Sequence, residues 1–152
     1  MFLCRGRIYP TRIRLDESSP YNFGKERQER RILMSFEMFG RTIRKIGVIG
    51  SGNIGPDIAL HCSQTLHAYG VPVVVVDIAQ SALDAGSKKA ESKMIKAAEK
   101  KIYKKEEADA IFRNMIFTTD YGKLSDADLL IEAAFERLDI KHKIFAQLEE
   151  TC

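Results

Sequence analysis

The sequence predicts an α/β fold in which a parallel sheet carries helices on both of its faces. Residues 46–49 form a short apolar run that is followed at once by a glycine-rich turn and a helix-like segment. Residues 71–76 (VPVVVV) are apolar on all sides, as strands of a parallel sheet are when helices cover both faces. Apolar runs and amphipathic segments then alternate along the chain, which is typical of strands joined by crossover helices.

Strands and helices are expected to alternate from residue 44 onward. The first helix should end at Tyr69, because Gly70 suits the left-handed conformation in which many helices terminate. Residues 81–105 are rich in Ala, Lys and Glu, which favours one long helix. The expected strands are residues 46–49, 71–76, 115–118 and 129–131, and one face of a final helix is marked by Ile140, Ile144, Phe145 and Leu148.

Residues 1–42 show no clean period and are expected to be an N-terminal arm in front of a domain at residues 43–152. Pro10 and Pro20 favour coil, and residues 25–39 fit one short helix. The arm holds nine Lys and Arg against five Asp and Glu, whereas the domain holds fifteen against sixteen. A nearly neutral domain gives no support to nucleic-acid binding, which depends on clustered positive charge.

The cysteines and the apolar runs favour a cytoplasmic protein. Cys4, Cys62 and Cys152 lie far apart and form no Cys-x-x-Cys pair, so neither a metal site nor a redox motif is expected. A sparse, odd number of cysteines fits a reducing compartment. No apolar run approaches the about 20 residues of a membrane span, and the first 15 residues lack the apolar stretch of a signal peptide.

A Gly-x-Gly-x-x-Gly motif links the first expected strand to the first helix. Gly50 would make the tight turn, Gly52 would leave room for a pyrophosphate, and Gly55 would let the helix pack closely on the sheet. The helix N-terminus would offer N–H groups and a partial positive charge to the phosphates. The candidate cofactor-binding residues of this loop are Gly50, Ser51, Gly52, Asn53, Ile54 and Gly55.

An acidic residue, Asp77, stands at the end of the second expected strand, 22 residues after Gly55. A carboxylate there accepts hydrogen bonds from the adenosine ribose and repels the 2′-phosphate of NADP. No Arg follows immediately to offset that repulsion. The pattern therefore predicts a Rossmann-type fold with NAD as its cofactor, and the alternative is a glycine-rich turn without a ligand.

Charged residues near the loop and on the long helix suggest further contacts. Asp57 adds a negative charge close to the phosphate site, and we expect it to point outward and favour the helix N-terminus. Five lysines repeat every three or four residues and would share one side of the helix. This stripe fits either a solvated face or a site for a phosphorylated ligand, and its period does not choose between them. The lysines are Lys89, Lys93, Lys96, Lys100 and Lys104.

Three segments together resemble 3-hydroxyacyl-CoA dehydrogenases. They are residues 44–77, the lysine-rich helix and residues 127–141 (ADLLIEAAFERLDIK), and the resemblance covers about residues 43–152. The IEAAFE segment at residues 131–136 is more specific than the glycine motif. The resemblance implies the NAD-binding portion of an enzyme that oxidises 3-hydroxyacyl-CoA to 3-oxoacyl-CoA in fatty-acid β-oxidation.

By position, the resemblance implies roles for four more residues. Glu136 and Lys141 match residues that line the nicotinamide half of the cofactor. Lys100 matches a lysine that contacts coenzyme A, so an acyl-CoA substrate is the implied partner. Lys93 stands where relatives carry a serine that also contacts coenzyme A. Without the family, Glu136 is a charged residue before a helix and Lys141 is a solvated one.

No residue of the chain matches the catalytic histidine of the family, which lies beyond the segment that aligns. The last strands of the dinucleotide fold and the C-terminal helical domain lie there as well. We therefore expect an incomplete fold that is inactive alone, with a bare outer edge on the strand at residues 129–131. Such an edge predicts self-association or a C-terminal partner chain. The alternative functions are a stand-alone regulatory NAD-sensing domain without catalysis and a structural remnant that binds nothing.

Overall fold

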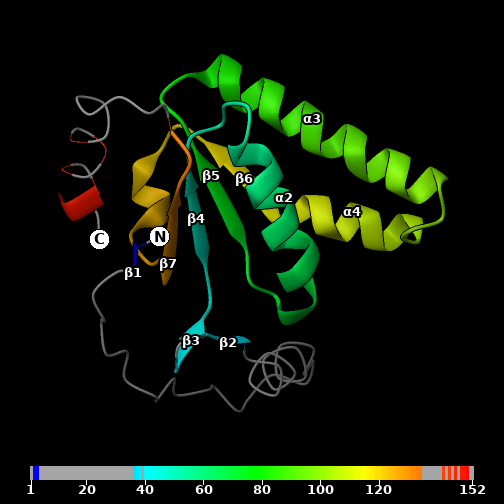
Figure 1. The fold of residues 1–152 in the computed structure, drawn as a ribbon, viewed down its shortest axis with the longest axis horizontal. Helices are drawn as coiled ribbons and strands as arrows, with labels where there is room; N and C mark the ends of the chain where they lie inside the picture. The colour runs from blue at the N-terminus through cyan, green and yellow to red at the C-terminus, as the bar shows by residue number, and fades with distance from the viewer. Residues whose placement is uncertain are drawn as a thin grey trace, which may run out of the picture.

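A computed structural model describes residues 2–3, 36–38, 40–134, 142, 144, 146 and 148–150 (Figure 1). Its larger sheet contains β1 (Phe2–Leu3), β4 (Ile46–Ile49), β5 (Val73–Val76), β6 (Met115–Thr118) and β7 (Leu129–Glu132). The helices are α2 (Gly55–Leu66), α3 (Gln80–Glu99) and α4 (Lys105–Arg113), with single 3₁₀ turns η1 (His67–Tyr69) and η2 (Tyr121–Leu124). A separate pair of strands is formed by β2 (Phe36–Met38) and β3 (Arg41–Ile43).

Four strands of the larger sheet are parallel and lie in the order β6-β5-β4-β7. In chain order this is third, second, first and fourth, the arrangement of the first four strands in Rossmann-type folds. The first strand, β4, is therefore central, with Ile46 opposite both Val73 of β5 and Leu129 of β7. The predicted α/β fold with a parallel Rossmann-type sheet is confirmed.

Both faces of the sheet are buried, as the all-apolar strands predict. Side chains alternate across a strand, so Val73 and Val75 join the core beneath α2, α3 and α4, while Val74 and Val76 join a second core. The second core also contains Tyr121 and Leu124 of η2 together with Ile144 and Leu148. Ile144 and Leu148 belong to the predicted final helix, and the structure describes both as helical and buried.

Most predicted elements lie where the sequence indicates. Each predicted strand is present within two residues of its expected bounds. Gly70 ends the helical segment as expected, with a left-handed backbone (φ 67°) and its N–H donating to the carbonyl of His67. A glycine is favoured there because it has no Cβ to clash in that conformation.

The prediction of one long helix over residues 81–105 is wrong. Helix α3 ends at Glu99, Lys101 adopts a left-handed backbone (φ 58°), and α4 begins at Lys105. Ala108 and Ile111 of α4 are buried three residues apart, so this segment has an apolar face of its own. It therefore turns back and runs beside α3, as Figure 1 shows.

The N-terminal residues that the structure describes also differ from expectation. Residues 36–38 are a strand that pairs antiparallel with β3, whereas one helix was expected over residues 25–39, the rest of which lies outside the described residues. The outer edge of β7 is not bare, because β1 pairs antiparallel with it, Phe2 opposite Leu130. The expected boundary between the N-terminal arm and the domain, at residues 42 and 43, falls inside β3, and this boundary stays a prediction.

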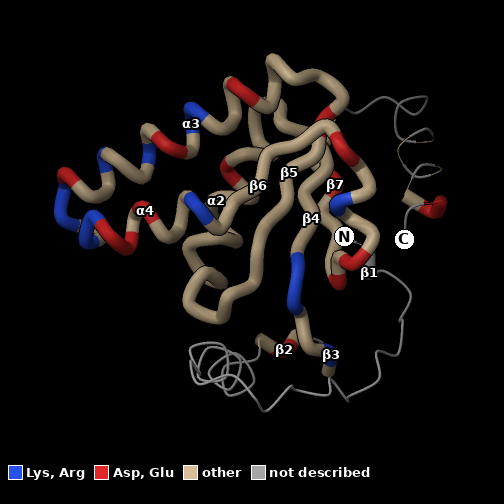
Figure 2. Tube along the Cα trace, turned by 180° about the vertical axis from the view of Figure 1, so that it is seen from behind, with Lys and Arg blue, Asp and Glu red and all other residues tan. Residues whose placement is uncertain are grey.

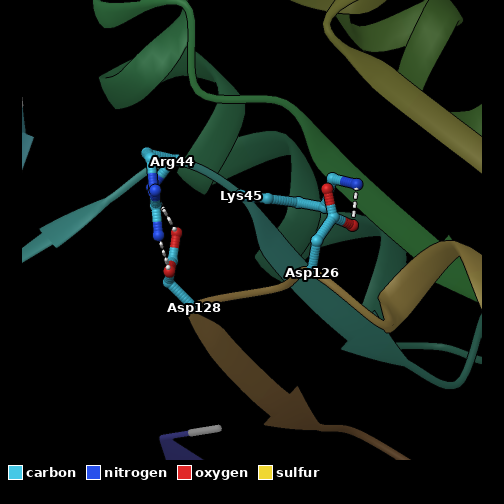
Figure 3. Close-up of polar contacts among 4 residues, drawn as sticks. All are labelled: Arg44, Lys45, Asp126 and Asp128. Carbon is cyan, nitrogen blue, oxygen red and sulfur yellow. Dashed lines mark hydrogen bonds and ion pairs between the residues drawn. The ribbon is translucent and has the colours of Figure 1, made fainter. Parts of the chain in front are cut away.

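Two ion pairs join the beginning of β4 to the segment before β7 (Figure 3). Asp128 accepts the backbone N–H of Arg44 at 2.7 Å, and its other oxygen lies 3.1 Å from the Arg44 guanidinium. The Lys45 ammonium pairs with the carboxylate of the more exposed Asp126, without a backbone hydrogen bond. These contacts lie at the amino ends of the strands, so they hold the sheet together away from the glycine loop.

Replacing Asp128 by Ala should lower the free energy of unfolding by about 1–2 kcal/mol, because it removes a charge-assisted acceptor of a backbone N–H together with an ion pair. The matched control is Asp126→Ala, which removes only a surface ion pair and should cost less than about 1 kcal/mol. Urea unfolding followed by circular dichroism measures both. Equal losses in the two variants would contradict the assignment.

Candidate dinucleotide-binding site

The glycine loop lies at the carboxyl ends of the two central strands. Gly50 follows β4 and donates its N–H to the carbonyl of Val76 at 2.7 Å, so the loop is attached to the end of β5. The next residue, Ser51, donates its backbone N–H to the carboxylate of Asp77, also at 2.7 Å. The candidate residues from the two strand ends are therefore brought together, 26 positions apart in sequence.

Two of the three motif glycines are required by the loop itself. Gly50 has a positive φ of 104°, and a Cβ there would lie 2.8 Å from the carbonyl oxygen of Ala133. A Cβ on Gly55 would lie 1.8 Å from the carbonyl oxygen of Gly50, which no real structure tolerates. These glycines let the chain turn sharply and start α2 against the sheet.

Gly52 differs from the other two, because a Cβ built on it would meet nothing within 4 Å. Among the described residues, no acceptor takes the backbone N–H of Gly52 or Asn53. Open space beside Gly52 and N–H groups without a protein acceptor, at the N-terminus of a helix, suit the anionic pyrophosphate of a dinucleotide. The site therefore fits the cofactor that the sequence predicts.

Ser51 has a packing role that the sequence did not indicate. Its side chain is buried, and its hydroxyl donates to the carbonyl of Ala82 in α3 at 3.0 Å. Opposite it, Gly86 of α3 leaves no room for a Cβ, which would lie 2.3 Å from the Ser51 hydroxyl and 2.7 Å from the Pro56 ring. Gly86 thus lets α3 approach the loop, and a glycine inside an otherwise Ala- and Lys-rich helix was the signal for it.

The carboxylate of Asp77 is oriented by two backbone groups. One oxygen accepts the N–H of Ser51, and the other accepts the N–H of Ala79 at 2.9 Å. Nearby, Tyr121 is buried, and burial, with the Asp77 charge as a second cause, raises the pKa of its hydroxyl. The Asp77 charge is thus fixed beside the loop rather than free to rotate into solvent.

The structure divides the lysine stripe into two parts. Lys89 and Lys93 reach from α3 to Asp57 in the first turn of α2, at 3.0 and 2.7 Å. Asp57 therefore faces α3, whereas the sequence predicted that it points outward. Lys100 lies immediately after α3 and is exposed, and Lys104 precedes α4 rather than extending α3.

Lysines are frequent in the segment between α3 and α4, at Lys100, Lys101, Lys104 and Lys105, and Figure 2 colours this end of the helix pair largely blue. The apolar residues of the same region are only partly buried. Met94 is 2% exposed, whereas Ile95 and Ile102 are 53% and 65% exposed. The projecting α3–α4 pair therefore presents both lysines and isoleucines to solvent.

Glu136 and Lys141 lie outside the described residues, so their roles stay predictions. His67 is held by the chain's own carbonyls, with its Nδ1 within 3.2 Å of the oxygens of Ser63 and Gln64. His61 is the seventh residue of α2 and is exposed. Neither histidine is part of the glycine loop or of the segment that follows β5.

Fold and loop together define a Rossmann-type dinucleotide-binding domain. The family model for the NAD-binding domain of 3-hydroxyacyl-CoA dehydrogenase matches residues 45–152. The chain therefore belongs to this family, and NAD is its cofactor. The cofactor expectation is confirmed at this level.

Individual relatives agree with the family assignment. A probable 3-hydroxyacyl-CoA dehydrogenase of Caenorhabditis elegans is 34% identical in an alignment that covers 74% of this chain and 38% of the relative. A 3-hydroxyadipyl-CoA dehydrogenase of Escherichia coli is 33% identical over 72% of this chain and 22% of the relative. Among solved structures, 3-hydroxybutyryl-CoA dehydrogenase of Escherichia coli superimposes with a TM-score of 0.66 at 34% identity, over 72% of this chain and 22% of that chain. The chain thus spans well under half the length of these relatives.

Proposed function

We propose that this chain is the NAD-binding portion of a 3-hydroxyacyl-CoA dehydrogenase of fatty-acid β-oxidation. The observation that carries the proposal is the open loop at Gly52 beside an oriented Asp77 carboxylate. In this reading the loop N–H groups and the α2 N-terminus bind the pyrophosphate, and Asp77 binds the adenosine ribose. Glu136 and Lys141 line the nicotinamide half, on the strength of the family resemblance alone.

Bound NAD would accept a hydride from the 3-hydroxyl carbon of the acyl-CoA substrate. The hydroxyl proton must leave to a base within hydrogen-bond reach. Neither His61 nor His67 belongs to the loops that form the candidate site, and the resemblance matches none of the three histidines, His142 included, to the catalytic position. We therefore propose that the base comes from a C-terminal partner chain or segment, and that the isolated 152-residue chain does not turn over.

Assaying the purified chain tests this proposal. With acetoacetyl-CoA and NADH, the chain alone should give no oxidation of NADH above the background rate, although it binds the cofactor. Light scattering on the same sample reports whether it self-associates. Sustained turnover by a monomer of this chain would contradict the assignment of the base to another segment.

Lys100 is proposed as the coenzyme A contact, because its ammonium is exposed just beyond the end of α3. Lys100→Glu should weaken acetoacetyl-CoA binding by about tenfold or more in the complete enzyme, since it reverses a charge beside a phosphate, and should leave NAD binding unchanged. Lys88→Glu is the matched control, an exposed lysine of α3 outside the stripe. Equal effects of the two variants would show that Lys100 is an ordinary solvated lysine and not a coenzyme A contact. Binding of coenzyme A would also distinguish the proposed dehydrogenase function from a regulatory NAD sensor.

Lys93, the second candidate substrate contact, is paired with Asp57, which favours Lys100 over Lys93 in that role.

Within the described residues, no helix is long and apolar enough to cross a membrane. Burial raises the pKa of the Cys62 thiol, which is free and half-buried. A protonated, unpaired thiol suits the reducing cytoplasm that we propose as the location.

A further inference from the structure

Asp57 places a negative charge in the first turn of α2, the helix whose N-terminus faces the candidate phosphate site. A carboxylate in that turn stabilises the helix by interacting with its partial positive charge. The same interaction offsets the charge that an anionic ligand would use. An acid at this position therefore opposes pyrophosphate binding unless another group neutralises it.

Two lysines from a different helix supply that neutralisation. Lys93 donates to one carboxylate oxygen of Asp57 at 2.7 Å, and Lys89 donates to the other at 3.0 Å. The hydrogen bond from Lys93, supported by that from Lys89, lowers the pKa of Asp57 against the opposing effect of burial. Asp57 is thus a carboxylate with a cation on each oxygen.

Lys89 also contacts the glycine loop directly. Its ammonium donates to the backbone carbonyl of Asn53 at 2.8 Å, while it holds Asp57. This carbonyl belongs to the same loop whose N–H groups at Gly52 and Asn53 point to no acceptor among the described residues. One side chain of α3 therefore fixes the loop and cancels the nearby negative charge.

We propose that Lys89 and Lys93 are positioning residues for the cofactor, which neutralise Asp57 and hold the Asn53 carbonyl so that the N-terminal end of α2 accepts the pyrophosphate. The inference rests on the proposed NAD-binding function. It assigns these two lysines of the stripe to the cofactor half of the site. Lys100, immediately after the end of α3, remains with the substrate.

The test compares NAD and adenosine binding by calorimetry in a series of variants. Lys89→Gln/Lys93→Gln should weaken NAD binding by about tenfold and leave adenosine binding unchanged, because adenosine carries no phosphate. Adding Asp57→Asn to that pair should restore most of the NAD affinity. Lys89→Arg/Lys93→Arg keeps both charges and should bind NAD nearly as wild type does, and Lys88→Gln is the surface control.

The outcomes separate this inference from the proposed function. Failure of the wild-type chain to bind NAD would overturn the proposed function and the inference with it. Wild-type binding together with undiminished NAD affinity in Lys89→Gln/Lys93→Gln would overturn the inference alone. It would also be overturned if adenosine and NAD weakened equally, or if Asp57→Asn restored nothing, because either result would assign the lysines to packing of α2 on α3.

Discussion

Replacing Gly52 by Val is expected to abolish detectable NAD binding while the chain keeps its fold. A Cβ at residue 52 meets no protein atom within 4 Å, so the folded chain has room for the new side chain. The same space is where a pyrophosphate must approach the loop backbone. Valine would therefore block the ligand without disturbing the protein.

Gly55→Val is the contrasting variant. A Cβ at residue 55 would lie 1.8 Å from the Gly50 carbonyl oxygen, so the loop and the start of α2 must move. Calorimetric titration with NAD and thermal unfolding by circular dichroism distinguish the two variants. Gly52→Val should lose binding at a wild-type melting temperature, whereas Gly55→Val should lose both, and a Gly52→Val protein that binds NAD would exclude the loop as the phosphate site.

The second large effect expected is discrimination against NADP. The Asp77 carboxylate is held beside the loop by two backbone N–H groups. The 2′-phosphate of NADP would face this like charge, a juxtaposition that costs several kcal/mol. We therefore expect NAD to bind on the order of 100-fold or more tighter than NADP.

Asp77→Asn tests the source of that discrimination. Asparagine removes the charge but keeps one oxygen acceptor, so NAD affinity should fall only modestly while NADP affinity rises. Parallel titrations of both cofactors against both proteins give the ratio. A wild-type chain that binds NADP as tightly as NAD, or a ratio unchanged in Asp77→Asn, would show that Asp77 does not select the cofactor.

The parts of the fold that follow from local rules could be predicted from the sequence. Four β-branched residues at 73–76 require burial on both faces, and Gly70 has the conformation that ends a helix. The glycine motif predicts its own turn, because Gly50 has a positive φ and a Cβ on Gly55 would clash with the carbonyl oxygen of Gly50, five residues earlier. Strand, turn and helix thus specify one another over a short span.

Contacts between distant segments could not be predicted in this way. Composition alone does not show that α3 stops at Glu99, since Ala, Lys and Glu continue past the turn. The pairing of β1 with β7 joins residues more than 120 positions apart, and no local pattern indicates it. The α4 helix had a signal in the spacing of Ala108 and Ile111, but the predicted helix stopped at residue 105 and no element was expected over residues 106–114.

The lysine stripe illustrates the same limit at the candidate site. Its period places five lysines on one side of a helix but carries no information about their partners. Asp57 lies 32 and 36 positions before Lys89 and Lys93, on another helix, and only the packing of α2 against α3 brings them together. Only the tertiary structure therefore gives Lys89 and Lys93 a partner, and thus a proposed role, that differs from that of Lys100.

The location of the cofactor site is the central claim, and a two-dimensional ¹H–¹⁵N correlation spectrum recorded during NAD titration tests it directly. The largest shift changes should cluster at the backbone amides of residues 50–55, 57 and 77–79, which belong to the loop, the start of α2 and the segment after β5. Adenosine should reproduce the changes at residues 77–79 but not those at Gly52 and Asn53. Shift changes centred on the α3–α4 turn, or no changes at saturating NAD, would contradict this location of the site.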